Sequence, residues 1–351
     1  MKHLKIFSFF LFLFIIISAL PSCVTKPETP ETRAASYYEY FDTVSVIFSY
    51  AGDSKEEFDA NCQKAEEVLK EYHRLFDIYY EYEGVNNLKT VNLNAGKEPV
   101  KVDRKLIDFL LYAKEMYTLT SGKTNVAMGA VLKLWHDARE NATDNPENAA
   151  LPSLEALNEA AKHTDINCLI INEEESTVFL SDPQMRLDVG AIGKGYATER
   201  AAEALMLVGA NSYVLNVGGN IRAIGRKTAT EGWTTGITNP DKSSAESFSC
   251  RVVIEDTSLV TSGDYERYFT VDGTRYHHII DPDTNMPADY FSSVSVFTKD
   301  GGLADTLSTA LFCMSYEEGL ALVNGIEGVD VIWIEQDGSL KHTKNIVFAK
   351  K

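Results

Sequence analysis

The side chains best suited to chemistry gather in residues 275–282, which read Arg-Tyr-His-His-Ile-Ile-Asp-Pro. This run places two imidazoles, a guanidinium and a carboxylate around the end of a predicted strand. It follows residues 261–269 and a hairpin turn at Asp272-Gly273, so polar groups are expected at the ends of two paired strands. Histidine titrates near neutral pH, and the run therefore suits proton transfer. The alternative is a strand-terminating turn at Asp281-Pro282 with histidines at ordinary strand positions.

A glycine-rich turn in residues 187–197 forms a second candidate site and is expected to open a helix that ends at Gly209. The free N–H groups and the positive dipole end of such a helix suit a phosphate. A Walker A loop is excluded because Asp188 and Gly195 occupy positions that need Gly and Ser or Thr, and the Rossmann glycine order is also absent. A purely structural turn is the alternative. Gly218-Gly219, between two predicted strands, leaves room for a flat ligand.

Asp305 and Thr309 form a third candidate site on a helix predicted over residues 302–316. They are four residues apart and share one helix face, so both oxygens can point at one hard cation such as Mg²⁺. One carboxylate and one hydroxyl are a partial shell, which carbonyl groups, water and a substrate phosphate would complete. The alternative is that Asp305 complements the helix dipole and that Thr309 is an ordinary helix residue.

Helices and antiparallel hairpins must position these groups. A capping box at Ser54 precedes apolar residues that recur at helical spacing as far as Phe76. Further helices are predicted from about residue 103 and over residues 153–162, and Asp337-Gly338 predicts a late hairpin. Two polar segments, residues 141–150 and 226–248, are predicted to be surface loops. The mixture predicts an α+β fold rather than a doubly wound parallel sheet.

The first 22 residues carry the pattern of an export signal. Lys2 and Lys5 precede an apolar run that ends at Leu20-Pro21-Ser22-Cys23 and is shorter than the ~20 residues of a membrane-spanning helix. The four residues Leu20-Pro21-Ser22-Cys23 resemble a bacterial lipobox, which would make Cys23 the lipidated N-terminus. Ordinary signal-peptidase cleavage is the alternative. Residues 23–36 then form a polar tether with two prolines, and the folded domain is expected over residues 37–351.

Charge and cysteine content exclude some classes of function. The chain has 33 basic and 51 acidic residues and a formal charge of −18, which argues against a nucleic-acid partner. A phosphate ligand must then be held locally. The cysteines that follow Cys23 have no zinc-site spacing. An exported protein permits disulfides, but the scattered spacing favours buried free thiols at Cys62, Cys168, Cys250 and Cys313.

Taken together, the motifs resemble those of the ApbE family of FAD:protein FMN transferases. The resemblance extends from about residue 38 to the C-terminus, and several unrelated short motifs occur in the family's order. The matching segments are residues 187–197, 215–221, 261–269, 276–287 and 304–311, with a weaker match at 129–135. The resemblance implies a T-fold-like α+β architecture of mixed or antiparallel sheets and packed helices, with FAD in a cleft between two lobes.

The resemblance also implies a reaction. Family members bind FAD with Mg²⁺, transfer its FMN half to a Ser or Thr hydroxyl of a partner protein, and release AMP. On this chain the metal would lie between the carbonyl of Ala191 and the side chains of Asp305 and Thr309, with Ser308 nearby. His278, directly before Ile279-Ile280-Asp281-Pro282, matches the family's functional histidine and is expected to be the base that also contacts FAD.

The resemblance also implies further FAD contacts at individual residues of this chain. Asp188 and Lys194 match positions that line the FAD site, Phe41 and Tyr79 fall where the family places residues against the rings, and Lys123, Thr124 and Asn125 occupy another contacting segment. Three departures stand out: Asn125 replaces an acid, Ala130 replaces a proline, and Asn285 replaces a glycine. Asn tolerates the left-handed turn that glycine would supply, so the change at Asn285 is mild.

Three functions remain open at this point. The first is FMN transfer from FAD to a partner protein, expected to be a membrane redox-complex subunit. The second is a Mg²⁺-dependent FAD pyrophosphatase, in which water replaces the acceptor hydroxyl. The third is an FAD-binding lipoprotein without catalysis. The export signal and lipobox place the protein, in each case, on a bacterial membrane facing the periplasm or the cell exterior.

Overall fold

The computed structural model describes residues 32–350, and its centre is an eight-stranded sheet in the order β1-β2-β6-β7-β10-β15-β16-β17. Every neighbouring pair in this sheet is antiparallel. The strands are β1 Arg33–Tyr37, β2 Ser45–Ser49, β6 Ser212–Val217, β7 Asn220–Gly225, β10 Thr257–Gly263, β15 Ser293–Thr298, β16 Asp330–Ile334 and β17 Leu340–His342. The α+β class and the antiparallel sheet predicted from the sequence are confirmed.

Both faces of this sheet are covered. In β15 all six residues are buried, because Val294 and Val296 pack toward the helices α7 and α8 while Phe297 packs on the opposite side. The opposite side is closed by a two-stranded hairpin of β8 Trp233–Thr238 and β9 Phe248–Ile254. The sequence of β15 still alternates between serine and valine, because Ser293 and Ser295 are buried on the same side as Phe297.

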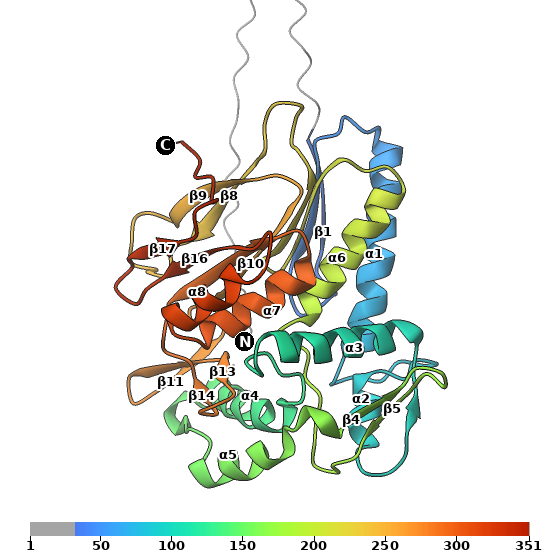
Figure 1. Ribbon diagram of the computed structural model, residues 1–351, viewed down its shortest axis with the longest axis vertical. Helices are drawn as coiled ribbons and strands as arrows, with labels where there is room; N and C mark the ends of the chain where they lie inside the picture. Colours follow the sequence, from blue (N-terminus) through green and yellow to red (C-terminus); the bar gives the residue numbers. More distant parts are fainter. Residues whose placement is uncertain (1–31, 351) are drawn as a thin grey trace, which may run out of the picture. The chain divides into compact units, whose positions relative to one another are not determined.

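Two groups of helices cover the face of the sheet that lies opposite the β8–β9 hairpin. In Figure 1, α1 and α6 run beside each other, and α7 and α8 lie in front of the strands. The capping box at Ser54 is formed as expected, with the hydroxyl accepting the Glu57 N–H and the Glu57 carboxylate accepting the Ser54 N–H. The bounds are α1 Lys55–Phe76, α6 Gly193–Leu207, α7 Gly301–Phe312 and α8 Tyr316–Asn324.

The remaining elements lie below the sheet in Figure 1 and include a small antiparallel sheet in the order β3-β5-β4. The helices are α2 Leu88–Leu93, α3 Arg104–Leu119, α4 Gly129–Asp144 and α5 Leu154–Ala160, with short 3-10 turns at Pro146–Asn148, Ala161–His163 and Ile166–Cys168. The strands are β3 Val100–Lys101, β4 Leu169–Asn172, β5 Thr177–Leu180, β11 Tyr268–Val271, β12 Thr274–His277, β13 Ile280–Asp281 and β14 Met286–Pro287.

Several expected boundaries are corrected. The tether predicted to reach residue 36 is too long, because Arg33–Tyr37 forms the edge strand β1 and pairs along its whole length with β2. The loop predicted over residues 226–248 contains all of β8, whose short polar sequence hid the strand pattern. The loop predicted over residues 141–150 begins inside α4, and the helix predicted over residues 302–316 ends at Phe312 before α8 starts.

Turn residues behave as their chemistry predicts. Asp272 and Gly273 both have positive φ and close the β11–β12 hairpin, and Gly338 has a φ of 82° between β16 and β17. Asn285 also adopts the left-handed region, with a φ of 57°, at the position where the resembled family has glycine. The four cysteines of the described residues are free thiols, as predicted, but only Cys62 and Cys313 are buried, and Cys168 and Cys250 are half-buried.

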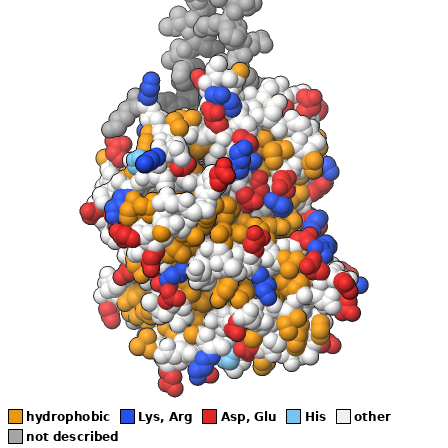
Figure 2. Space-filling model, viewed as in Figure 1, with side chains coloured by type: hydrophobic (Ala, Val, Ile, Leu, Met, Phe, Trp, Pro, Cys, Tyr) orange, Lys and Arg blue, Asp and Glu red, His pale blue; other side chains and the backbone are white. Residues whose placement is uncertain are grey.

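On the face drawn in Figure 2, acidic and basic side chains are intermixed, with hydrophobic side chains visible between them. The described residues contain no helix that is long and apolar enough to span a membrane. The export signal and Cys23 lie outside the described residues.

Gly195 fixes the crossing of α6 and α7. A Cβ at this position would lie 2.2 Å from the carbonyl oxygen of Gly301 and 2.4 Å from the Cβ of Asp305. Both neighbours belong to α7, and the first is backbone, so neither could move aside without displacing the helix. The close approach lets the Gly195 N–H donate to Asp305 Oδ2 at 2.8 Å.

Replacing Gly195 with alanine is expected to force the two helices apart. Overpacking of this kind costs about 1–3 kcal/mol, so the free energy of unfolding of Gly195→Ala should fall by that amount in urea denaturation. Leu207→Ala, on the same helix but with an 88% exposed side chain, is the control and should change stability by less than about 0.5 kcal/mol. Equal stability of the two variants would contradict the tight crossing.

Candidate functional site

One large cavity brings the predicted residues together. It has a volume of about 1460 Å³ and is lined by segments from the sheet, from α6 and α7, and from the β11–β12 hairpin. Of the residues predicted from the sequence, those that line it are Phe41, Tyr79, Lys123, Thr124, Asn125, Asp188, Ala191, Lys194, His278, Asp305 and Thr309. Ser308 is buried behind the wall of the cavity.

The glycine-rich turn leads into α6 as expected. Asp188 Oδ1 accepts the N–H of Gly190 at 2.9 Å, which closes the turn, and the N–H of Gly193 donates to the carbonyl of Val189 at 2.7 Å. Burial raises the pKa of Asp188, while the Gly190 N–H and nearby cations, including Lys194, act in the opposite direction. The turn therefore presents Ala191 and Lys194 to the cavity on a fixed backbone.

Asp305 and Thr309 lie on one face of α7, as their spacing predicts. Burial raises the pKa of Asp305, and Lys194 and the Gly195 N–H oppose that shift. Behind them Ser308 donates to the carbonyl of Asp305 at 2.9 Å, and Ser262 of β10 lies 2.9 Å from Ser308 Oγ and 3.4 Å from Thr309 Oγ1. The hydroxyl groups tie this face of α7 to β10.

The donor set fits a hard cation that is also bound by substrate. Among residues 32–350 no group of three or more His, Cys, Asp or Glu side chains could hold a metal ion by itself. Asp305 supplies a carboxylate in a buried setting, where a neighbouring cation would stabilise its charged form. Oxygen-only donors that leave part of the shell to water and phosphate suit Mg²⁺.

His278 is held with one nitrogen fixed and the other available. The carbonyl oxygen of Arg267 lies 3.2 Å from His278 Nδ1 and also accepts the His278 backbone N–H at 3.1 Å. A carbonyl only accepts, so Nδ1 carries the proton and Nε2 keeps its lone pair. Burial lowers the pKa of His278 to about 3, assisted by the positive charges of Arg267 and Lys194. The imidazole is therefore neutral near pH 7.

His277 has a different role from its neighbour. Its Nε2 donates to the carbonyl of Ala288 at 2.7 Å and its Nδ1 accepts the N–H of Ile279 at 3.2 Å. The ring is buried and meets Phe312 of α7 edge-on. Burial lowers its pKa as well. With both nitrogens engaged, His277 anchors the strand end that presents His278.

Residues 123–125 are engaged within the protein. Lys123 pairs with Asp281 and Asp283, both at 2.8 Å; burial opposes its charge, but the two carboxylates prevail and raise its pKa. Thr124 donates to the carbonyl of Thr306 at 2.9 Å. The amide of Asn125 joins two neighbouring loops through Thr164 and Ala127. The segment fixes the cavity wall against α7 and the strand β13.

The aromatic side of the cavity is positioned by His73. Phe41 has a φ of 57°, which is unusual for a bulky residue, and its N–H donates to His73 Nδ1 at 3.2 Å. His73 Nε2 lies 3.2 Å from the hydroxyl of Tyr82, which donates to Asp77 at 2.7 Å. Tyr79 is 49% exposed at the cavity mouth. This hydrogen-bond chain fixes the strained turn that carries Phe41.

Two groups of site residues were missed by sequence reasoning. Ser262 and Arg267 lie in a segment whose sequence indicated a site, but only the fold gives them partners in Thr309 and His278. Arg139 and His73 line the cavity from helices that carried no chemical signal. Both helices carry many other charged and polar residues, so helical spacing alone could not single these two out.

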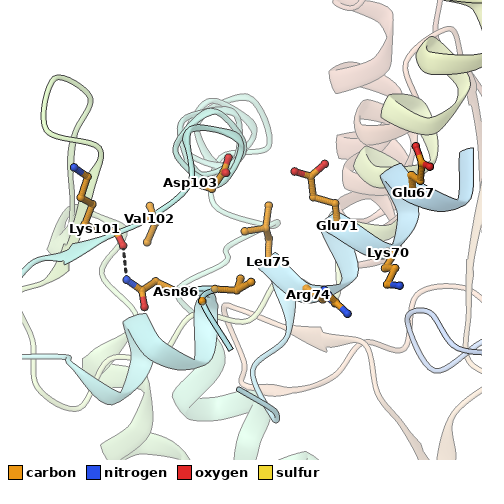
Figure 3. Close-up of a pocket in the computed structure, with 11 residues that line it drawn as sticks. Glu67, Lys70, Glu71, Arg74, Leu75, Asn86, Lys101, Val102 and Asp103 are labelled. Atoms are coloured by element: carbon orange, nitrogen blue, oxygen red, sulfur yellow. Dashed lines mark hydrogen bonds between the residues drawn. The ribbon is translucent and has the colours of Figure 1, made fainter. Parts of the chain in front are cut away.

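A second, smaller cavity of about 440 Å³ lies beside the C-terminal half of α1 (Figure 3). None of the predicted site residues lines it. Its charged and polar groups pair locally: Asn86 Nδ2 donates to the carbonyl of Lys101 at 2.8 Å, and Glu71 pairs with Lys105 at 2.5 Å. Arg74 lies over the ring of Tyr82, 5.4 Å from its centroid. The chemistry of the chain therefore concentrates in the larger cavity.

Comparison with known proteins agrees with this geometry. A sequence model of the ApbE family matches residues 42–333. The FAD:protein FMN transferase of Treponema pallidum is 36% identical over 274 residues, which are 74% of each chain, and that of Klebsiella pneumoniae is 31% identical over 272 residues, 75% of this chain and 82% of that relative. A crystal structure of the ApbE protein from Thermotoga maritima superposes with a TM-score of 0.78 at 27% identity and covers 90% of this chain and 97% of that one.

The flavin transferase ApbE from Vibrio cholerae superposes with a TM-score of 0.73 at 27% identity over 89% of this chain and 96% of that structure. The matched region contains the glycine-rich turn, the β11–β12 hairpin and α7, the three segments that meet in the large cavity. The family resemblance inferred from the motifs is confirmed. This chain belongs to the ApbE family.

Proposed function

We propose that this protein transfers the FMN half of FAD to a Ser or Thr hydroxyl of a partner protein and releases AMP, with Mg²⁺ bound beside the phosphates. The observation that carries the proposal is that a buried carboxylate and a neutral imidazole lie in the same cavity. One is the buried carboxylate of Asp305, and the other is the neutral imidazole of His278, whose Nδ1 is committed to a carbonyl. The relatives from Treponema pallidum and Klebsiella pneumoniae are FAD:protein FMN transferases, which supports the same reaction class.

The residues divide the reaction between them. The carbonyl of Ala191 and the side chains of Asp305 and Thr309 would hold Mg²⁺, which neutralises charge that develops on the phosphates. Lys194 and the N–H groups of the glycine-rich turn add fixed positive charge on the same side. Phe41 and Tyr79 offer aromatic surface at the cavity mouth for the ring systems of FAD.

His278 acts on the acceptor. Its Nε2 takes the proton of the acceptor hydroxyl as the oxygen attacks the FMN phosphorus, and the bond from that phosphorus to the bridging oxygen breaks. The bridging oxygen leaves on AMP. A neutral imidazole can accept this proton, and the negative charge of bound FAD would raise the low pKa of His278 toward the range of an efficient base.

The proposed cellular location rests on the export signal in the first 22 residues. Export and lipidation at Cys23 would hold the domain on a bacterial membrane, facing the periplasm or cell exterior, where a membrane redox subunit could serve as acceptor. The support is the lipobox-like run 20–23 and the polar segment that follows it.

Removing the charge of the proposed metal ligand Asp305 should strongly reduce turnover. In Asp305→Asn the shape and the acceptor for the Gly195 N–H are kept, but the charge is lost, so Mg²⁺-dependent AMP release should fall about 10²–10³-fold. EDTA should have a similar effect on the wild type. Glu317→Gln, which removes an exposed carboxylate on α8, is the control and should stay fully active. Full activity of Asp305→Asn would reject the metal assignment.

His278→Ala should separate chemistry from binding. FAD affinity should stay near that of the wild type, while flavinylation of a Thr-bearing acceptor, read as in-gel flavin fluorescence, should fall about 10²–10⁴-fold. His277→Ala should reduce the free energy of unfolding by about 1–3 kcal/mol through its lost hydrogen bonds and should slow transfer less. Parallel loss of FAD binding and transfer in His278→Ala would show that His278 acts by binding FAD and not as the base.

Lipidation can be tested by fractionation of cells. Wild-type protein should sediment with membranes, because an acyl chain contributes about 0.8 kcal/mol per buried CH₂. Cys23→Ala should be released or remain as an unprocessed precursor, which mass spectrometry distinguishes. Identical processing and fractionation of the two forms would remove the support for a lipid anchor.

A further inference from the structure

The hairpin β8–β9 offers one strand edge to the large cavity. Five consecutive residues, 234–238, line that cavity. Side chains alternate between the two faces of a strand, so a cavity that meets consecutive residues meets the edge of the strand and not one of its faces.

This edge of β8 is unpaired in the part of the chain that the structure describes. On the other side β8 pairs with β9, and β9 in turn pairs with the C-terminal segment, where Val253 donates to Val347 and Ala349 donates to Arg251. Arg251 and Val253 thus face the C-terminal segment, which leaves their neighbours in β9 to face β8.

The register then identifies which groups of β8 point into the cavity. Val252 and Ile254 of β9 lie opposite Thr235 and Trp233, so those two residues use their backbone groups within the hairpin. Groups alternate along a strand, and the N–H and C=O of Thr234 and Gly236 therefore face outward. The strand carries no charged residue and no proline, the usual devices that keep a free edge from pairing.

The edge of β8 contacts the segment that positions His278. Thr238, at its end, hydrogen-bonds the side chain of Tyr265, and Arg267, two residues further, provides the carbonyl that fixes His278. Phe248 stands on the same wall with its ring 39% exposed. A chain laid along β8 would thus enter the cavity that contains His278.

We propose that the free edge of β8 binds an extended segment of the acceptor protein as an added strand, and so delivers the acceptor Ser or Thr to His278. The inference rests on the proposed function, which requires that a hydroxyl on a protein chain reach the cavity. Backbone hydrogen bonds supply the affinity in this mode, and the side chains next to the hydroxyl-bearing residue alternate between cavity and solvent.

The test uses Thr234→Pro and its matched control Thr234→Val in the full mature protein. Proline removes the outward N–H, whereas valine keeps both the N–H and the branched shape. The probe is a pool of synthetic peptides with a fixed central threonine and six randomised residues on each side. Flavinylated peptides are recovered by flavin fluorescence and sequenced, and kinetics are measured on the best of them.

For Thr234→Pro the KM for the selected peptide should rise about tenfold, the effect of one lost hydrogen bond, while Kd for FAD stays unchanged. Thr234→Val should match the wild type in both. An unchanged KM in Thr234→Pro, or an equal rise in both variants, overturns the strand-docking proposal. A wild type that releases AMP but flavinylates no peptide overturns the proposed transfer, and the docking proposal with it.

A second measurement works even if Thr234→Pro does not fold. The selected peptide is resynthesised with single N-methylated residues, each of which removes one backbone N–H. Strand pairing predicts that sensitivity alternates along the peptide, with every second position impairing transfer by the wild-type enzyme. Sensitivity without a two-residue period overturns strand addition.

Discussion

The close crossing of α6 and α7 is the contact on which the rest of the cavity depends. Gly195 allows the helices to touch backbone to backbone, and the Gly195 N–H bonds Asp305 directly. One turn further along α6, Glu199 accepts the N–H of Gly301 at 2.9 Å and forms a buried ion pair with Arg222 of β7. The glycine-rich turn, the face of α7 that carries Asp305 and the central sheet are thereby joined at one point.

The ion pair of Glu199 and Arg222 also shows how polar groups are accommodated in this interior. Buried charges are tolerated when each is paired and hydrogen-bonded. Here the carboxylate also accepts the hydroxyl of Ser258, and the guanidinium reaches Asp256 at 3.1 Å. Replacing either Glu199 or Arg222 with an uncharged residue would leave the other charge unpaired between α6 and the sheet, directly behind the glycine-rich turn.

Local chemistry made much of this predictable. The capping box at Ser54, the turn at Asp272-Gly273 and the left-handed Asn285 follow from interactions within a few residues, and all three form as expected. Asp305 and Thr309 share a face because helical spacing requires it.

The strands and residue roles that the sequence did not predict depend on distant parts of the chain. The strand β8 is hard to recognise from its own sequence, because its small polar residues pair with β9, a separate segment that begins at Phe248, and because its other edge lines the cavity. The strand β1 resembles a tether in its sequence because, within residues 32–350, it pairs with β2 alone. The roles of Ser262, Arg267 and His73 arise from contacts that the fold makes, and no short motif encodes them.

The two halves of the site differ in how deeply they are buried. Helix α7 is buried along nearly its entire length, so Asp305 and Thr309 sit in closely packed surroundings. His278 instead follows a short hairpin with an exposed tip at Asp272-Gly273, and its ring is held by a single carbonyl. In the proposed reaction, the closely packed half binds the nucleotide, and the half at the exposed hairpin meets the incoming chain. Such a division would let one enzyme modify partners of differing shape without relaxing its selectivity for FAD.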